Sequence, residues 1–324
     1  MIRSCNIFLP AIALSLVACE TVVDVDVPNE PTRLVANAFL QADSTVVLEL
    51  TQSQSILTNS DIRPVSGAEA VLLEEGRAVT TLEETQRAGV YTASFTPTVG
   101  RSYTLQVSKV GFEPVEATTF IRPPVMIREF SFDTVAFRSV VDYGDSVVTE
   151  VNFEVDEVRI SFDDPAADRN YYEISAYRFE VYARDSFDNQ GNYVQTDTIR
   201  TRVPLSLESD DPALAEGEGD FLASDAAVAY GEVLSFNDDF FNGNNYSFQF
   251  DPNAYYDPNW AEPQLYVVLR TIDEGQYRYF RSVDLQYEND GNPFAEPVQV
   301  YSNVENGFGI VSGSSADEVV VNLE

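Results

Sequence analysis

Few side chains in this sequence could carry out acid–base or nucleophilic chemistry. The chain has two cysteines, a single lysine and no histidine, the side chain best suited to proton transfer near neutral pH. A Ser-His-Asp triad, a Cys-His dyad and an ordinary zinc site are therefore excluded. Carboxylate, Ser-Lys and oxygen-ligated metal chemistry are the classes that remain.

Cys19 is the cysteine whose surroundings predict a modification. Residues 1–18 begin with one positive charge, Arg3, continue through a short apolar run and end on the small residue Ala18, as a secretory signal peptide does. The apolar run is too short to span a bilayer. Leu16-Val17-Ala18-Cys19 also resembles a lipobox, in which the cysteine sulfur is acylated and becomes the first residue of the mature protein. We predict lipidation of Cys19, against the alternative of an ordinary signal peptide with an incidental cysteine.

Clustered carboxylates raise the question of a calcium site, because calcium prefers carboxylate and carbonyl oxygens. The candidate ligands are Asp210, Asp211, Glu216, Glu218 and Asp220. The alternative is a solvated loop, since chance clusters are expected in so acidic a chain. Paired carboxylates could also hydrolyse glycosides, but nothing in the sequence selects one pair among so many.

Aromatic side chains in a proline-rich segment are candidates for binding a ligand or a partner. Tyr255, Tyr256 and Trp260 lie in residues 251–263, which contain three prolines. Aromatics on such a loop can stack on sugar rings or anchor a partner protein, and the alternative is that they pack back onto the fold. Arg278 and Arg281 could bind a carboxylate ligand, with internal ion pairs as the alternative.

The overall charge limits the choice of partner. The chain has 53 acidic and 19 basic residues, with a formal net charge of -34. Such a surface repels nucleic acid and anionic lipid headgroups, so we expect neither as a partner. Because salt weakens self-repulsion, the composition favours a saline habitat.

The elements that must position these residues are mostly strands. Apolar residues alternate with polar ones in several stretches after Arg33, which is typical of half-buried strands. Arg122-Pro123-Pro124-Val125 interrupts the pattern and is the predicted domain boundary. Thr271-Ile272-Asp273-Glu274 resembles a capping box, and apolar residues then recur at helical spacing from Tyr277.

We therefore predict a mainly β protein in four parts. These are a signal peptide (1–18), a lipidated tether (19–31), an immunoglobulin-like β-sandwich (32–122) and a larger β-rich domain (123–324) with a helix near 273–288. No cysteine pair or tryptophan marks the immunoglobulin family proper in the sandwich.

Several segments are similar to those of one family of Bacteroidota outer-membrane lipoproteins, known as a domain of unknown function. Beyond the lipobox and its acidic, valine-rich lead, the segments are Gly89-Val90-Tyr91, Gly100-Arg101-Ser102-Tyr103-Thr104-Leu105, Ser235-Phe236-Asn237-Asp238-Asp239-Phe240-Phe241-Asn242-Gly243, Tyr277-Arg278-Tyr279-Phe280-Arg281-Ser282, Gly291-Asn292-Pro293-Phe294-Ala295-Glu296-Pro297-Val298, Val300-Tyr301-Ser302-Asn303-Val304 and Gly307-Phe308-Gly309-Ile310. The resemblance covers nearly all of the mature chain. It implies an accessory of a TonB-dependent outer-membrane receptor, because members of that family tend to be encoded beside such receptors. It implies no catalytic residues.

From the sequence we expect a non-enzymatic outer-membrane lipoprotein that serves as an accessory or ligand-binding partner of a TonB-dependent transporter in nutrient uptake. Its lipid would hold it at the membrane, at the cell surface or, alternatively, at the periplasmic face. Calcium, at the clustered carboxylates, is the one cofactor that the sequence suggests. The rival hypotheses are a structural or adhesive surface module and a carboxylate-based hydrolase.

Overall fold

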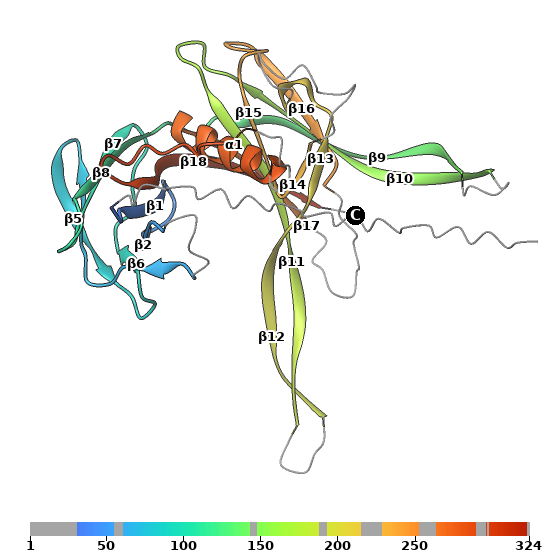
Figure 1. Cartoon of the computed structure of the whole chain (residues 1–324). Coiled ribbons are helices and arrows are strands. Elements are labelled where there is room, and N and C mark those ends of the chain that lie inside the picture. The colour runs from blue at the N-terminus through green and yellow to red at the C-terminus, as the bar shows by residue number, and fades with distance from the viewer. Residues whose placement is uncertain are drawn as a thin grey trace, which may run out of the picture. The chain divides into compact units, whose positions relative to one another are not determined.

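The chain forms a β-rich structure, seen in a computed structural model that describes residues 31–54, 61–142, 148–187, 193–214, 229–252, 264–289, 296 and 298–322 (Figure 1). No helix in these ranges is long and apolar enough to cross a membrane. The prediction of a mainly β fold with one helix in the C-terminal half is confirmed.

The first eight strands surround an N-terminal core. They are β1 (Leu34–Gln41), β2 (Val46–Gln52), β3 (Arg63–Pro64), β4 (Glu69–Glu74), β5 (Arg77–Glu84), β6 (Val90–Ala93), β7 (Arg101–Ser108) and β8 (Val115–Ile121). In β1 the alternating residues Leu34, Ala36, Ala38 and Leu40 are buried, as the period-two pattern predicts. Residues Leu34 to Ile121 supply most of this core, and Val304 and Val311 complete it from the C-terminal end of the chain.

The remaining elements surround a second, C-terminal core rich in aromatic rings. They are β9 (Ile127–Asp142), β10 (Val148–Asp163), β11 (Tyr171–Phe187), β12 (Tyr193–Pro204), β13 (Leu207–Ser209), a short 3₁₀ helix η1 (Pro212–Leu214), β14 (Ala229–Gly231), β15 (Val233–Asn237), β16 (Asn245–Phe250), β17 (Gln264–Ile272), α1 (Glu274–Asn289) and β18 (Phe308–Asn322). Phe236 and Phe248 stack with ring centroids 4.7 Å apart, and Phe162 and Tyr172 pack beside them. Such ring pairs add to the free energy gained by burying their area.

One mixed sheet contains strands of both cores, whereas β16-β10-β9 and β13-β14 form two smaller sheets. The order of the mixed sheet is β12-β11-β17-β18-β1-β2-β6-β5-β4-β7-β8, with β15 paired to β11 and β3 paired to β2. The join is the parallel pair of β1 with β18, in which Ala36 lies opposite Gly309. β18 contributes Val311 to the N-terminal core, whereas Val319 and Val321 pack against the C-terminal core. The predicted boundary at residue 122 falls between the cores, yet β18 serves both, so the division into two domains stays a prediction.

The helix α1 begins one residue after the predicted start, and its cap differs from the prediction. Asp273 Oδ1 accepts a hydrogen bond from the Gln276 backbone N–H at 2.7 Å, so Asp273 is the N-cap. Thr271 Oγ1 instead accepts a hydrogen bond from the Val125 N–H at 3.1 Å. The capping box that the sequence predicts at Thr271 is therefore wrong, because Thr271 still belongs to β17 and is used there as a tertiary acceptor.

The outer part of the β11–β12 hairpin extends beyond the sheet. β11 pairs with β17 only as far as Tyr177, and from Arg178 onward β12 is its one partner among the described strands. Figure 1 shows this stretch as a two-stranded ribbon that leaves the sheet, and β9 with β10 as a second ribbon. Among the described strands, this part of the ribbon therefore has two edges without a neighbouring strand, that of β12 and that of β11 beyond Tyr177.

Candidate interaction surface

A row of aromatic rings crosses the sheet where the β11–β12 ribbon leaves it. Tyr177 of β11 lies directly opposite Tyr266 of β17, and their rings stack with centroids 4.7 Å apart. Phe179, two residues farther along β11, meets both rings edge-on at 5.6 and 5.3 Å. The alternation of β11 places Tyr177 and Phe179 on one face, and the register with β17 brings Tyr266 to the same face.

Two arginines of β12 lie over these rings. The Arg200 guanidinium carbon is 3.3 Å from the Phe179 ring centroid, and that of Arg202 is 3.6 Å from the Tyr177 centroid. Both arginines are exposed to solvent. A stacked guanidinium is attracted by the negative face of the ring, which restricts its side chain to one orientation. We call Tyr177, Phe179, Arg200, Arg202 and Tyr266 the arginine–aromatic surface.

Hydrogen bonding and burial fix Tyr177 beneath Arg202. The Tyr177 hydroxyl donates to Glu318 Oε2 of β18 at 2.7 Å. Burial, together with this hydrogen bond to a carboxylate, raises the pKa of Tyr177 to about 12, so the phenol is neutral at physiological pH. The ring is therefore held from two sides, by Tyr266 and by Glu318.

Several arginines of the chain form ion pairs with carboxylates, whereas Arg202 forms none with a described residue. Arg128 pairs with Asp163 and Arg178 pairs with Glu180. Within the described ranges, no carboxylate lies within ion-pairing distance of Arg202, although the chain has 53 acidic residues. Its guanidinium keeps the N–H donors at its rim, which suit a carboxylate of another molecule.

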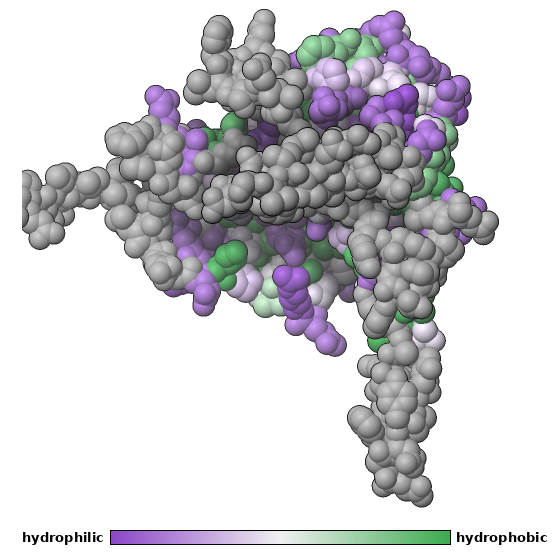
Figure 2. Space-filling view, turned by 90° about the vertical axis from the view of Figure 1, so that its right-hand side faces the viewer, coloured by the Kyte–Doolittle hydropathy of each residue, from purple (hydrophilic) through white to green (hydrophobic). Residues whose placement is uncertain are grey.

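The chemistry of this surface is that of protein recognition. Tyrosine and arginine are enriched at interfaces, where they supply contact area and directional hydrogen bonds together. In the face that Figure 2 shows, hydrophilic residues are mixed with smaller hydrophobic patches among the described atoms. The two exposed arginines over the aromatic rings fit an acidic partner better than an apolar one.

Most of the residues predicted to bind a ligand lie outside the described residues. These are Cys19, Tyr255, Tyr256, Trp260, Glu216, Glu218 and Asp220. Their predicted roles stay predictions.

Two of the predicted calcium ligands are described. Asp210 is exposed, whereas Asp211 is buried beside η1. Asp211 Oδ1 accepts hydrogen bonds from the Ala213 N–H at 2.9 Å and from the Tyr246 hydroxyl. Asp211 thus caps η1, and the described part of the chain contains no group of three or more acidic or cysteine side chains placed to hold a metal ion. Calcium binding stays a prediction that depends on residues 215–228.

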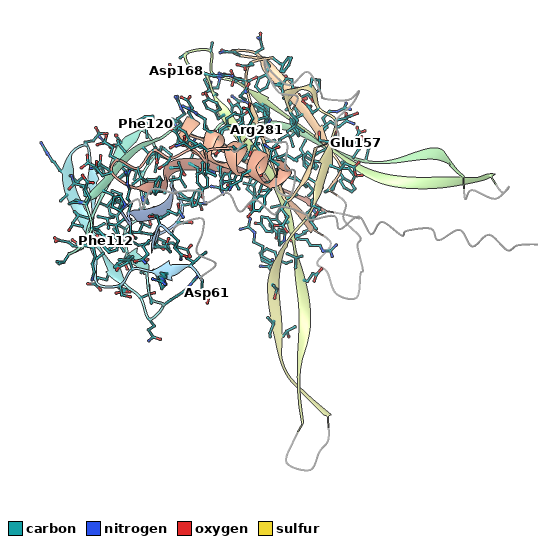
Figure 3. All side chains as sticks on the ribbon, viewed as in Figure 1. Asp61, Phe112, Phe120, Glu157, Asp168 and Arg281 are labelled. Carbon is teal, nitrogen blue, oxygen red and sulfur yellow. The ribbon has the colours of Figure 1, made fainter. Side chains whose placement is uncertain are left out.

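The two arginines considered on the helix lie on α1, as Figure 3 shows for Arg281. Arg278 Nη1 is 3.6 Å from Glu274 Oε1, one turn earlier, and its guanidinium carbon lies 4.3 Å from the Tyr301 ring centroid. Arg278 therefore has partners within the chain, in line with the internal-pairing alternative.

Three of the segments that carry the family resemblance, 277–282, 300–304 and 307–310, lie in or beside α1 and β18. Ser282 Oγ of α1 accepts a hydrogen bond from the Tyr301 N–H at 2.8 Å. The Asn303 side chain bonds both the N–H and the carbonyl of Val311, at 3.0 and 2.8 Å, as a neighbouring strand would. These motif residues therefore fasten the C-terminal segment to the helix and the sheet.

An acidic groove of about 460 Å³ lies at the other end of the sheet. Glu69, Glu116 and Glu305 line it, and Gln106 Nε2 donates to Glu116 Oε2 at 2.6 Å. The carboxylates whose pKa is raised by burial lie elsewhere in the fold: the buried Glu173 and Asp238 and the half-buried Asp273. A groove and a perturbed carboxylate pair are thus not found together in the described residues, and the hydrolase alternative stays a prediction.

Sequence reasoning missed the arginine–aromatic surface. The sequence does contain a signal for this surface. Tyr177 and Phe179 are two positions apart in one predicted strand, and Arg200 and Arg202 are two positions apart in the next. Both pairs are visible in the sequence, but their contact depends on the hairpin register, which places Phe179 opposite Arg202. That register cannot be deduced without the length of the connecting turn.

Comparison with known proteins gives a family but no characterised relative. A family model described as a domain of unknown function (DUF4249) matches residues 20–319. Searches of curated proteins and of solved structures found no match. The matched range includes the whole arginine–aromatic surface.

Proposed function

The chain belongs to the family described as a domain of unknown function, DUF4249, and from that premise we propose that it is a non-enzymatic partner protein of a TonB-dependent outer-membrane transporter. In this role it assists nutrient uptake while its lipid holds it at the outer membrane. The resemblance of its motifs to Bacteroidota outer-membrane lipoproteins encoded beside such receptors supports the choice of partner.

The arginine–aromatic surface is the observation that carries the proposal. Arg200 and Arg202 stack at 3.3 and 3.6 Å on rings that are themselves packed against the sheet. Because these side chains are already ordered, a partner that binds them loses less conformational entropy than it would on free arginines. Two exposed arginines held in place on packed aromatic rings support a binding role.

The lipobox supports attachment to a membrane. Cys19 is the one cysteine left after removal of residues 1–18, since Cys5 lies within them. One acyl chain gives only reversible binding, so stable attachment requires the multiple acylation usual for this modification. A Cys19→Ser variant is expected to leave the membrane fraction, and recovery of that variant with the membranes would contradict lipid attachment.

The proposal is tested by deleting the gene and measuring growth on defined media in which glycans, peptides or iron chelates are limiting in turn. A transport role predicts slow growth on one of these sources and recovery when the wild-type gene is restored. Restoring the Cys19→Ser gene is expected to give little recovery. Unchanged growth on every source, together with reduced attachment to surfaces, would overturn the transport role in favour of an adhesive module.

A further inference from the structure

We infer that one end of the N-terminal core rests on a membrane of zwitterionic lipids, with the exposed valine of the β7–β8 turn inserted among the headgroups. We call it the tether end and define it by residues 32–33, 61–68, 109–114 and 305–308. This inference rests on the lipid attachment that the proposed function includes, because it specifies how the chain is oriented once its lipid lies in the bilayer.

The segments of the tether end are far apart in the sequence but lie together in the fold. The strand pairs β1–β2 and β2–β3 bring residues 32–33 beside residues 61–68. The contacts that join the remaining segments are the Arg33 guanidinium carbon over the Phe308 ring at 5.6 Å, Lys109 Nζ donating to the Gly67 carbonyl oxygen at 3.1 Å, and Asn306 Nδ2 donating to the Pro114 carbonyl oxygen at 3.3 Å.

The chain enters the fold at this end. Thr32 and Arg33 lead directly into β1, and residues 19–31 connect them to the cysteine proposed to carry the lipid. That connection spans at most about 45 Å when fully extended. An eight-residue strand such as β7 is about 27 Å long, so the opposite end of the core is reached only by running back along the strands. The tether end therefore has the shortest path to the lipid.

The β7–β8 turn carries an apolar side chain where turns usually have a polar one. Val110 is 96% exposed, between Lys109 and Gly111, whose φ is +93°. The Phe112 N–H donates to the Lys109 carbonyl oxygen at 3.0 Å, and the Phe112 ring packs against the N-terminal core. The turn is thus anchored behind the valine. Ile62, also at the tether end, is 77% exposed, and apolar side chains of this kind are stabilised in the interface between headgroups and acyl chains.

The charges of the tether end select the lipid. Arg63 and the half-buried Lys109 are basic, whereas the exposed Asp61, Glu113 and Glu305 are acidic. A zwitterionic headgroup offers an amine and a phosphate, and so has a partner for each sign. An anionic lipid surface is instead repelled by the field of a chain whose net charge is -34. Phosphatidylethanolamine fits these charges better than phosphatidylglycerol.

The lipid makes such a small contact sufficient. Two apolar side chains alone bind a membrane weakly, but an attached lipid keeps the tether end at a high effective concentration beside the bilayer. The contact therefore orients the chain and does not attach it. A Cys19→Ser chain is accordingly expected not to bind the vesicles.

The inference is tested with the lipidated mature chain in vesicles of phosphatidylethanolamine and phosphatidylcholine that contain a doxyl-labelled lipid. Because acylation blocks the Cys19 sulfur, a fluorophore labels only the cysteine introduced by Val110→Cys. Val99→Cys is the matched control, since Val99 is 43% exposed, also precedes a glycine of positive φ, and lies at the opposite end of β7. Quenching should be at least about threefold stronger at residue 110 than at residue 99, because interfacial side chains insert only about 5–10 Å.

A second label tests whether Val110 itself makes the contact. In Ile62→Cys the label should also be quenched, and adding Val110→Asp should reduce that quenching to the level found at residue 99, since a carboxylate is costly to place among apolar groups. Val99→Asp is the control and should leave quenching at residue 62 unchanged. Replacing phosphatidylethanolamine by phosphatidylglycerol should reduce quenching at residue 110, and stronger quenching there would overturn the choice of lipid.

Failure of this inference is distinguishable from failure of lipid attachment. Equal quenching at residues 110 and 99, or quenching at residue 62 that Val110→Asp does not change, would overturn the inference while lipid attachment stands. A lipidated chain that does not stay with the vesicles would overturn both. A fluorescence signal at residue 110 that changes with protein concentration in the absence of vesicles would assign the tether end to a second copy of the chain, and would also overturn the inference.

Discussion

At the scale of single residues, Asp238 is a buried carboxylate with incomplete hydrogen bonding among the described residues. Its side chain is fully buried, and its Oδ2 accepts hydrogen bonds from the Asn170 N–H at 2.9 Å and from Asn170 Nδ2 at 3.3 Å. Its Oδ1 has no partner among the described residues. Burial raises the pKa of Asp238, and the nearby Asp164 carboxylate adds to the rise.

The raised pKa makes stability depend on pH with a definite sign. A carboxyl whose pKa is higher in the folded than in the unfolded chain binds its proton more tightly when folded, so it lowers stability as pH rises through that folded pKa. Asp238→Asn should therefore raise the free energy of unfolding at neutral pH by about 1 kcal/mol, since it removes a buried charge. The gain should shrink as pH falls toward the ordinary aspartate range.

Urea unfolding measured between acidic and neutral pH checks this prediction. The control is Asp239→Asn, at a partly exposed carboxylate that pairs with Arg169. It should lower stability by no more than about 0.5 kcal/mol, the usual size for an exposed ion pair. A loss of stability in Asp238→Asn at neutral pH would show that the charged form is needed by the turn around Asn170.

The polar run Asn237-Asp238-Asp239 has the composition of a turn, but nothing in the sequence indicates that Asp238 is buried. Asn237 Oδ1 accepts a hydrogen bond from the Asp239 N–H at 2.9 Å, which is the local contact that such residues make. The partner of Asp238 is Asn170, which is 68 residues away in the chain. Local composition contains no information on contacts of that separation.

At the scale of elements, the parallel pairing of β1 with β18 holds the two halves of the sheet together. Gly309 sits at this junction with a φ of +107°, and a Cβ there would lie 2.2 Å from the Ala36 carbonyl oxygen. Asn37 Oδ1 accepts a hydrogen bond from the Ile310 N–H at 3.2 Å across the same strand pair. The glycine is thus required both by its backbone conformation and by the close approach of β1.

Gly309→Ala should therefore separate the strands at this junction and lower the free energy of unfolding by at least about 3 kcal/mol. Gly100→Ala is the matched control, because Gly100 also has a positive φ of +74° but a Cβ there meets nothing within 4 Å. The control should cost only about 1 kcal/mol, the backbone penalty alone. Denaturant titration of both variants measures the difference, and equal losses would mean that β1 does not approach β18 as closely as described.

Elements with a local signal were predicted from the sequence, and those defined by distant pairing were not. The apolar spacing from Tyr277 predicted α1 to within a residue at each end, since a helix satisfies its own hydrogen bonds. The pairing of β1 with β18 joins residues 273 positions apart, as at Asn37 and Ile310, and no periodic pattern specifies such a partner. The cap at Asp273 was missed by two positions because Thr271 matched the same motif.

At the scale of the whole molecule, the net charge of -34 sets the conditions under which the chain is stable. Self-repulsion among so many carboxylates destabilises the compact state, and salt screens it. Several of the described ion pairs are well exposed, such as Arg87 with Glu49, and contribute little to offset it.

The melting temperature should therefore rise by several degrees when sodium chloride is increased from low concentration to about that of seawater, in line with stronger screening. A neutral osmolyte at equal osmotic strength is the control for effects that do not involve charge. Calorimetry or circular dichroism gives the measurement. A melting temperature that falls with salt would contradict both the repulsion argument and the inference of a saline habitat.

The central claim is that this protein binds a TonB-dependent transporter through the arginine–aromatic surface. The most direct measurement is co-purification of the tagged, membrane-attached chain in mild detergent, with the transporter quantified by mass spectrometry. The account predicts recovery of the transporter with the wild-type chain and with the control Arg77→Glu, at an exposed arginine of β5, and its loss when Arg200→Glu and Arg202→Glu are combined. A wild-type chain recovered without a transporter, or equal recovery with the double variant, would contradict it.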